Sequence, residues 1–195
     1  MTTSRAERRG DARDRLLVRL LDAFEGDLPS PEVSLREVAA RAETSHALLR
    51  YHFGSLPGVL AAMLTEQRSR DNQTLVKAAE RGTFDDLVLA MWRSYTRPVQ
   101  LSRARGFFHV VGLAAYSPGD FQEFVDSLDD LTAMLASLAE REGRDPADAL
   151  NLAIVTVAAI RGLLLQQVLA PSVHTQDALA LILRMNKSGD DRQDD

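Results

Sequence analysis

Side chains that could perform catalysis are few in this sequence, and their spacing matches no catalytic or metal-binding motif. The chain of 195 residues has no cysteine, which rules out disulfides, thiolate metal sites and a cysteine nucleophile. Its four histidines stand at positions 46, 52, 109 and 174, without the spacing of metal ligands. No glycine-rich phosphate loop or nucleophile motif accompanies them. We therefore expect no metal, no cofactor and no enzyme; the enzyme alternative would need His109, His174 or a pair of carboxylates.

The polar side chains best suited to recognising another molecule lie in one stretch, which reads Ser34-Leu-Arg-Glu-Val-Ala-Ala-Arg-Ala-Glu-Thr-Ser-His-Ala-Leu-Leu-Arg-Tyr-His-Phe-Gly-Ser. Ser34 can cap a short helix, and a break around residues 42–44 precedes a second short helix from about Ser45 to His52. Ala39 is small where two such helices would cross at a steep angle. The pattern predicts a helix-turn-helix, whose second helix enters the major groove of DNA.

Apolar residues of the same stretch can fill the inner faces of both helices. These are Leu35, Val38, Ala42, Leu49 and Phe53. The first turn of the second helix would then project toward base edges, and the amides at the start of the first helix would suit a phosphate. The predicted DNA-contacting residues are Ser34, Arg36, Thr44, Ser45, His46, Ala47, Arg50, Tyr51 and His52. The alternative for the arginines and His46 is a solvated surface role, and for His52 a packing role.

From about residue 10 to residue 65 the sequence resembles the DNA-binding domain of the TetR family of one-component repressors. The most specific part is Thr44-Ser45, followed by Leu49 and the run Tyr51-His52-Phe53-Gly54-Ser55. The resemblance implies that the Tyr51 hydroxyl reaches a DNA phosphate, where the residue alone could be a packed aromatic. It also implies a homodimer on a palindromic operator, with recognition helices about 34–36 Å apart, and repression as the sign of regulation.

Three positions depart from the family's pattern. Glu43 stands where the family usually has glycine in the turn, and a left-handed conformation there would cost a non-glycine residue roughly 1–2 kcal/mol. Leu56 stands where the family often has a lysine near the phosphate backbone, and Arg50 where it often has a second aromatic. These departures predict a differently shaped turn, no phosphate contact from Leu56 and an additional one from Arg50.

The overall charge of the chain does not by itself favour binding to nucleic acid. A net charge of −5 argues against a protein that coats nucleic acid non-specifically. Residues 1–20 carry six arginines against three acids, but through Phe53 nine arginines balance nine acids. The arginines before Asp14 could form an arm that reaches DNA or a disordered tail, and the interruption by Glu7 and Asp11 favours the tail. DNA binding by this region must therefore depend on geometry.

The elements that carry these residues are expected to be helices throughout, because apolar residues recur with a period near 3.6 and no stretch alternates as a strand would. A stripe formed by Leu17, Leu20, Leu21 and Phe24 predicts a first helix that ends near Gly26. After the two short helices, six more are expected at about 55–80, 83–97, 101–116, 118–142, 146–169 and 175–186. The predicted fold class is all-α, with about nine helices.

We expect a three-helix DNA-binding domain at residues 1–54, a larger helical ligand-binding and dimerisation domain at 55–189, and a disordered acidic tail at 190–195. The helix at 146–169 is apolar nearly all round and the one at 175–186 carries another apolar stripe, so two subunits should pair through them. The apolar run 152–160 falls short of the roughly 20 residues of a membrane span. With a polar segment at 1–15, this predicts no signal peptide, no membrane and a cytoplasmic location.

Aromatic and thioether side chains of the second domain could line a cavity for a hydrophobic or aromatic effector. The candidate ligand residues are Met91, Trp92, Tyr95, Phe108, His109, Tyr116, Phe124, Met134 and Arg161. Each could instead be an ordinary core residue. Arg161 lies in a nearly all-apolar helix and needs a partner, so it is expected to contact the ligand or bridge the dimer interface.

The sequence thus predicts a regulator in which an effector shifts the helix at 55–80 and changes the spacing of two recognition helices. The alternative is a constitutive DNA-binding or protein-interaction module without an effector. That alternative would be favoured by a second domain whose aromatic side chains leave no cavity of a few hundred Å³.

Overall fold

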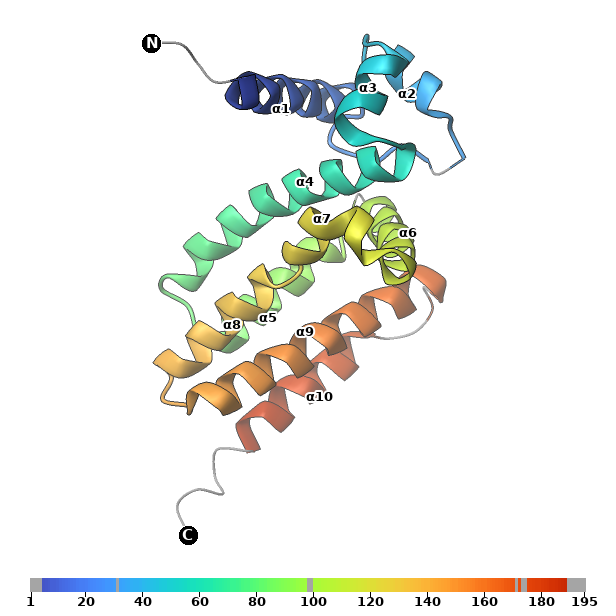
Figure 1. Cartoon of the computed structure of the whole chain (residues 1–195). Coiled ribbons are helices and arrows are strands. Elements are labelled where there is room, and N and C mark those ends of the chain that lie inside the picture. Colours follow the sequence, from blue (N-terminus) through green and yellow to red (C-terminus); the bar gives the residue numbers. More distant parts are fainter. Residues whose placement is uncertain (1–4, 31, 98–99, 171, 173–174, 189–195) are drawn as a thin grey trace. The chain divides into compact units, whose positions relative to one another are not determined.

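The computed structural model describes residues 5–30, 32–97, 100–170, 172 and 175–188, and helices dominate these ranges (Figure 1). Within them lie ten α-helices, the 3₁₀ turn η2 and no strand, so the predicted all-α class is confirmed. The elements are α1 (Arg5–Ala23), α2 (Leu35–Arg41), α3 (His46–Phe53), α4 (Leu56–Ala79), α5 (Phe84–Tyr95), α6 (Leu101–Tyr116), η2 (Pro118–Phe121), α7 (Gln122–Asp126), α8 (Asp130–Arg141), α9 (Pro146–Leu169) and α10 (Thr175–Ser188).

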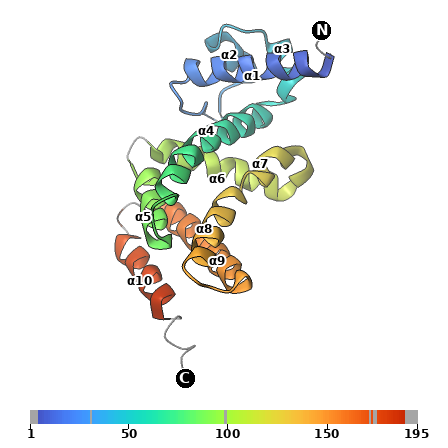
Figure 2. The ribbon, with the colours of Figure 1, turned by 90° about the vertical axis from the view of Figure 1, so that its left-hand side faces the viewer.

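The chain divides into two compact units. Unit 1 comprises the described residues of Met1–Ser69 and Gly106–Ser127, and unit 2 those of Arg70–Arg105 and Leu128–Asp195. Both α4 and α6 therefore contribute one part to each unit, and α4 is a single uninterrupted helix (Figure 2). The functional boundary expected between residues 54 and 55 stays a prediction. The expected acidic tail at 190–195 lies outside the described residues.

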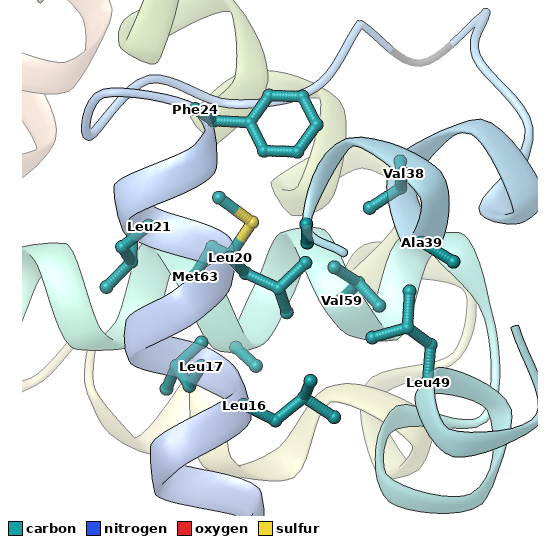
Figure 3. Packing of buried hydrophobic residues seen from close by; sticks show 12 residues of the cluster. Leu16, Leu17, Leu20, Leu21, Phe24, Val38, Ala39, Leu49, Val59 and Met63 are labelled. Carbon is teal, nitrogen blue, oxygen red and sulfur yellow. The ribbon is translucent and has the colours of Figure 1, made fainter. Parts of the chain in front are cut away.

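A hydrophobic core joins α1, α2, α3 and the first turns of α4 within unit 1 (Figure 3). The buried residues of α1 and of the turn directly after it follow the predicted helical spacing and are Leu16, Leu17, Leu20, Leu21 and Phe24. They meet Val38 and Ala39 of α2, Leu49 of α3, and Val59 and Met63 of α4. We call these three helices and the start of α4 the head. Its shared core fixes the orientation of α3 on the rest of the head.

The first helix begins earlier than the sequence predicts. A disordered tail is expected for the residues before Asp14, whereas α1 is continuous from Arg5, so that expectation is wrong for residues 5–13. Alanine, arginine and glutamate are strong helix formers, and Asp11 stands four residues before Arg15, a spacing that favours an ion pair along the helix. These local preferences outweigh the destabilising effect of Gly10 in the interior of the helix.

Unit 2 is organised around α9, which packs against α8 and α10. The predicted start of α9 is confirmed, because the Asp145 carboxylate accepts a hydrogen bond from the Ala147 N–H (2.9 Å) and Pro146 occupies the first turn. Thr83 caps α5, which begins where a helix was expected, and the hydrogen bond that its N–H donates to Asp86 lowers the pKa of that carboxyl. The Arg141 guanidinium donates to the carbonyl oxygen of Ala79 (2.8 Å), which ties α8 to the end of α4.

The helix expected from 118 to 142 is divided in the structure. Pro118 starts only a 3₁₀ turn, the short α7 follows, and α8 begins after a break at residues 127–129. Two arginines satisfy carbonyl groups at this break. In unit 1, Arg68 donates to the Ser127 oxygen (3.0 Å), and in unit 2, Arg161 donates to the Leu128 oxygen (2.9 Å). These donors are 59 and 33 residues away in sequence, so local periodicity could not reveal the break.

Candidate nucleic-acid interface

The outer face of α3 presents a continuous set of exposed side chains. Tyr51 is 58% exposed and Leu48 42%, whereas Leu49 between them is fully buried in the core of the head. Ala47 and Arg50 are exposed as well, and His46 is half-buried. The helix therefore offers an aromatic hydroxyl, a cation and a small apolar area on one side. This combination suits a phosphate backbone and base edges.

The two short helices of the head are capped by serines, of which Ser34 was predicted as a cap and Ser45 as the first residue of the second helix. The Ser45 hydroxyl accepts a hydrogen bond from the Leu48 N–H (3.1 Å) at the start of α3. At α2 the Ser34 hydroxyl accepts from the Glu37 N–H, while the Ser34 N–H donates to the Glu37 carboxylate (2.6 Å). That backbone hydrogen bond lowers the pKa of Glu37. It also occupies the amide of Ser34 and places a carboxylate where a phosphate was expected.

The turn between α2 and α3 is left-handed although a glutamate occupies it, so the prediction of a differently shaped turn is wrong. Glu43 has φ +48°, and the Thr44 N–H donates to the Ala39 carbonyl oxygen (2.9 Å). Arg19 of α1 donates to the carbonyl oxygen of Glu43 (3.3 Å). The turn is thus held by backbone bonds at the expense of an unfavourable conformation at Glu43.

Replacing Glu43 with glycine should raise the free energy of unfolding by about 1 kcal/mol, because glycine adopts a positive φ without a Cβ clash. Urea denaturation followed by circular dichroism measures the change. Glu43→Ala is the matched control, since it removes the same carboxylate but keeps the Cβ, and it should give none of this gain. Equal stabilisation by both variants would mean that removal of the carboxylate causes the effect, and it would contradict backbone strain at Glu43.

The joint between α3 and α4 depends on two glycines. Gly54 ends α3 with φ +75°, and its N–H donates to the Arg50 carbonyl oxygen (3.0 Å). A Cβ added to Gly58 would lie 2.0 Å from the carbonyl oxygen of Phe53, closer than any real contact allows. Leu56 is half-buried and packs against the core of the head, so the position where the family often has a lysine serves packing here. Only glycine at 58 permits this close approach.

The other predicted contact residues differ in exposure. Arg36 lies exposed on α2, and Thr44 is half-buried in the turn. His52 is half-buried, with its ring edge-on to Tyr51 (centroids 5.0 Å apart). Its position at the end of α3, away from the first turn, fits the packing alternative as well as a phosphate contact.

Leu48 is a residue of this face that the sequence reasoning missed. Adjacent helical residues are rotated by about 100°, so of the neighbouring Leu48 and Leu49 only one can enter the core. The adjacent pair of leucines in the sequence could therefore have indicated that one of them is exposed. An exposed leucine on a helix that lies in the major groove can contact the methyl group of thymine.

A second missed feature links the head to α7 within unit 1. The Arg13 guanidinium on α1 forms an ion pair with the Glu123 carboxylate (2.6 Å) and lies 5.5 Å from the centre of the Phe53 ring. Phe53 is the last residue of α3. The head is therefore connected to the residues around 123 through a side chain that sequence reasoning assigned to the N-terminal basic cluster. A partner 110 residues away leaves no local signal.

The candidate ligand residues fall into both units. In unit 1, Phe124 is buried and Phe108 half-buried, while His109 is exposed and Tyr116 is 92% exposed. In unit 2, Met91 and Trp92 are buried, and Tyr95 and Met134 are half-buried. The half-buried Arg161 donates to the Leu128 carbonyl oxygen, a role that neither predicted alternative included. Within the described ranges no cluster of acidic or histidine side chains could hold a metal ion.

Comparison with known proteins establishes the fold. No family model and no curated protein matches the sequence. A transcriptional regulator from Rhodococcus sp. Rha1 superimposes with a TM-score of 0.70 at 20% identity, covering 91% of this chain and 96% of that one. A TetR transcriptional regulator from Legionella pneumophila gives 0.62 at 16% (95% and 99% covered), and reduced E. coli NemR gives 0.61 at 20% (88% and 96%). The chain has the fold of TetR-type regulators.

Proposed function

We propose that the protein is a DNA-binding transcriptional regulator that binds a palindromic operator as a homodimer, and that it is a ligand-responsive repressor in the cytoplasm. The observation that carries this proposal is the geometry of α3. The helix is capped by Ser45, anchored in the core by Leu49, and turned so that Leu48 and Tyr51 face outward. The shared fold of TetR-type regulators supports the same assignment.

Dimerisation is supported by an apolar stripe along α9. Its large exposed side chains recur at helical spacing and are Leu150, Ile154, Val155, Leu165 and Leu169, with Leu181 exposed on the neighbouring α10. The opposite face of α9 is buried within unit 2. An exposed apolar stripe of this length is the usual mark of a protein interface, and a second copy of α9 and α10 is the partner that we propose.

By length and composition, α9 is also the one helix in the described part of the chain that could cross a membrane. Its buried face and the guanidinium of Arg161, which is bonded to a backbone carbonyl of unit 2, favour a soluble packing helix instead. The fold shared with transcriptional regulators supports the same assignment. We therefore propose a dimer helix for α9.

An effector would act by favouring one arrangement of α4, since this helix belongs to both units. The buried positions of Met91 and Trp92 fit ordinary core packing. A constitutive DNA-binding or interaction module without an effector is accordingly kept as the alternative. Operator affinity that stays constant in the presence of compounds shown to bind unit 2 would favour that module.

The operator can be found by selecting bound fragments from the sheared source genome with the purified protein. Enrichment of a palindromic fragment would support the proposal if the affinity of the protein for it falls steeply with salt concentration. Such a dependence is expected because side chains that neutralise phosphates release counterions. No enrichment at low salt would contradict DNA binding by this chain alone. The genes next to the enriched fragments would then indicate the class of effector.

Replacing Tyr51 with phenylalanine should weaken binding to that operator by about tenfold per head, because a hydrogen bond to a charged phosphate contributes about 1.5–3 kcal/mol. The salt slope should stay unchanged, since no cation is removed. Fluorescence anisotropy at several salt concentrations measures both quantities. Tyr116→Phe is the matched control, because this tyrosine is 92% exposed and lies outside the head. Equal effects of both substitutions would refute a contact by Tyr51.

A further inference from the structure

Unit 1 contains a cavity that the proposed function does not use. It has a volume of about 150 Å³ and lies where the end of α3 and the first half of α4 face the η2–α7 segment. Its lining residues are Arg13, His52, Phe53, Gly58, Ala61, Ala62, Thr65, Asp120, Phe121, Gln122, Glu123 and Phe124. A cavity of this size accommodates a molecule of about the volume of benzene.

The lining divides into an apolar part and a charged part. Ala61, Ala62 and Phe124 are buried and offer an apolar surface, to which the aromatic ring of Phe53 adds. The Thr65 hydroxyl oxygen is buried and has no hydrogen-bond partner among the described residues. A buried hydroxyl without a partner is costly, so a ligand atom that bonds it would be favoured. The cavity thus combines an apolar surface with one unsatisfied polar group.

Charges around the cavity determine which ligand it would take. The Glu123 carboxylate is paired with Arg13, and the Gln122 amide donates to Asp126 (2.7 Å). The exposed Asp120 carboxylate forms no ion pair in the described part of the chain. Among the arginine and the acidic side chains of the lining, one guanidinium against two carboxylates leaves one negative charge. A compound with a single positive charge is therefore favoured over an anion.

We propose that this cavity binds a small aromatic compound that carries one positive charge, such as an aromatic amine or amidine. The ring would lie against Ala61, Ala62 and Phe124, and the cationic group would pair with Asp120. The bound compound would also contact Phe53 and the Arg13–Glu123 pair, which connect it to the end of α3. This connection rests on the proposed function, whereas the binding site itself does not.

Binding is tested by calorimetric titration of the full chain, without DNA, with benzamidine, benzyl alcohol and benzoate. We expect one benzamidine per chain with a dissociation constant on the order of 1 mM or below, weaker binding of benzyl alcohol, and none of benzoate. Backbone amide NMR shifts at His52, Phe53 and residues 120–124 would locate the ligand. Saturation by none of the probes, equal or tighter binding of benzoate, or shifts elsewhere would overturn the site.

Asp120→Asn should weaken benzamidine binding by about tenfold and leave benzyl alcohol binding unchanged. Asp22→Asn is the matched control, because it removes the same charge from an exposed position of unit 1 outside the cavity. If the two variants weakened benzamidine binding equally, the preference for a cation would come from the net charge of the protein, and the role of Asp120 would be overturned. Both residues are exposed, so neither substitution should prevent folding.

Operator titration in the presence of saturating benzamidine tests the connection to DNA reading. A change of at least about fivefold in operator affinity would support it, and no change would overturn it. If the wild-type chain bound no operator at all but still bound benzamidine through Asp120, the proposed function would fail while the site would stand. The two ideas are therefore separable by experiment.

Discussion

Truncation of Leu49 to alanine should lower the free energy of unfolding by about 2–5 kcal/mol, which is a large part of the stability of a domain of this size. Leu49 is fully buried and brings α3 into contact with the core residues of α1, α2 and α4. Its truncation leaves a cavity at the point where α3 is anchored in the head. Thermal and urea denaturation followed by circular dichroism measure the change, and operator affinity should fall as α3 loses its fixed orientation.

The neighbouring Leu48 provides the matched control for this substitution. Because Leu48 is 42% exposed, Leu48→Ala should change stability by less than about 0.5 kcal/mol. It should nevertheless weaken operator binding and relax the preference at one base pair, since this side chain would face the major groove in the proposed complex. Equal destabilisation by both alanine variants would mean that α3 is rotated from the orientation described above, and the assignment of its outer face would be wrong.

The boundaries of most helices were predictable because their signals are local. Ser45, Thr83 and Asp145-Pro146 begin helices where capping chemistry requires, and apolar residues at helical spacing identify the buried face of α1. Capping does not determine where a helix stops. The pattern from 118 to 142 continues as a helix in sequence, but Arg68 and Arg161 stabilise a break in it from distant positions.

The candidate interface was predictable for a similar reason, and its surroundings were not. The helix-turn-helix is a contiguous segment, so the sequence was sufficient to place Ser45 at the start of α3 and Leu49 in the core, whereas the differently shaped turn predicted from Glu43 is wrong. The ion pair between Arg13 and Glu123 joins residues 110 positions apart. For the same reason the cavity between α4 and the η2–α7 segment left no trace in the sequence pattern. Tertiary packing alone brings those groups together.

A charge on the exposed face of α9 should have a large effect on the proposed dimer. Val155 is 64% exposed in the middle of the apolar stripe, so a glutamate there would be buried without a partner if two copies of α9 pair. Val155→Glu should convert the dimer to a monomer while the helical content stays the same. Sedimentation velocity of the wild type and the variant measures the mass directly.

Operator binding should respond to the same substitution, because two linked heads bind a palindrome far more tightly than one. Val155→Glu should therefore weaken operator affinity by roughly 100-fold or more, although α9 contributes no residue to the head. Val76→Glu is the matched control, since Val76 is also an exposed valine on a helix of unit 2 but lies outside the stripe. A variant at Val155 that remains dimeric would place the interface elsewhere. One that becomes monomeric without loss of affinity would show that a single head is sufficient, and the palindromic operator would then have no structural basis.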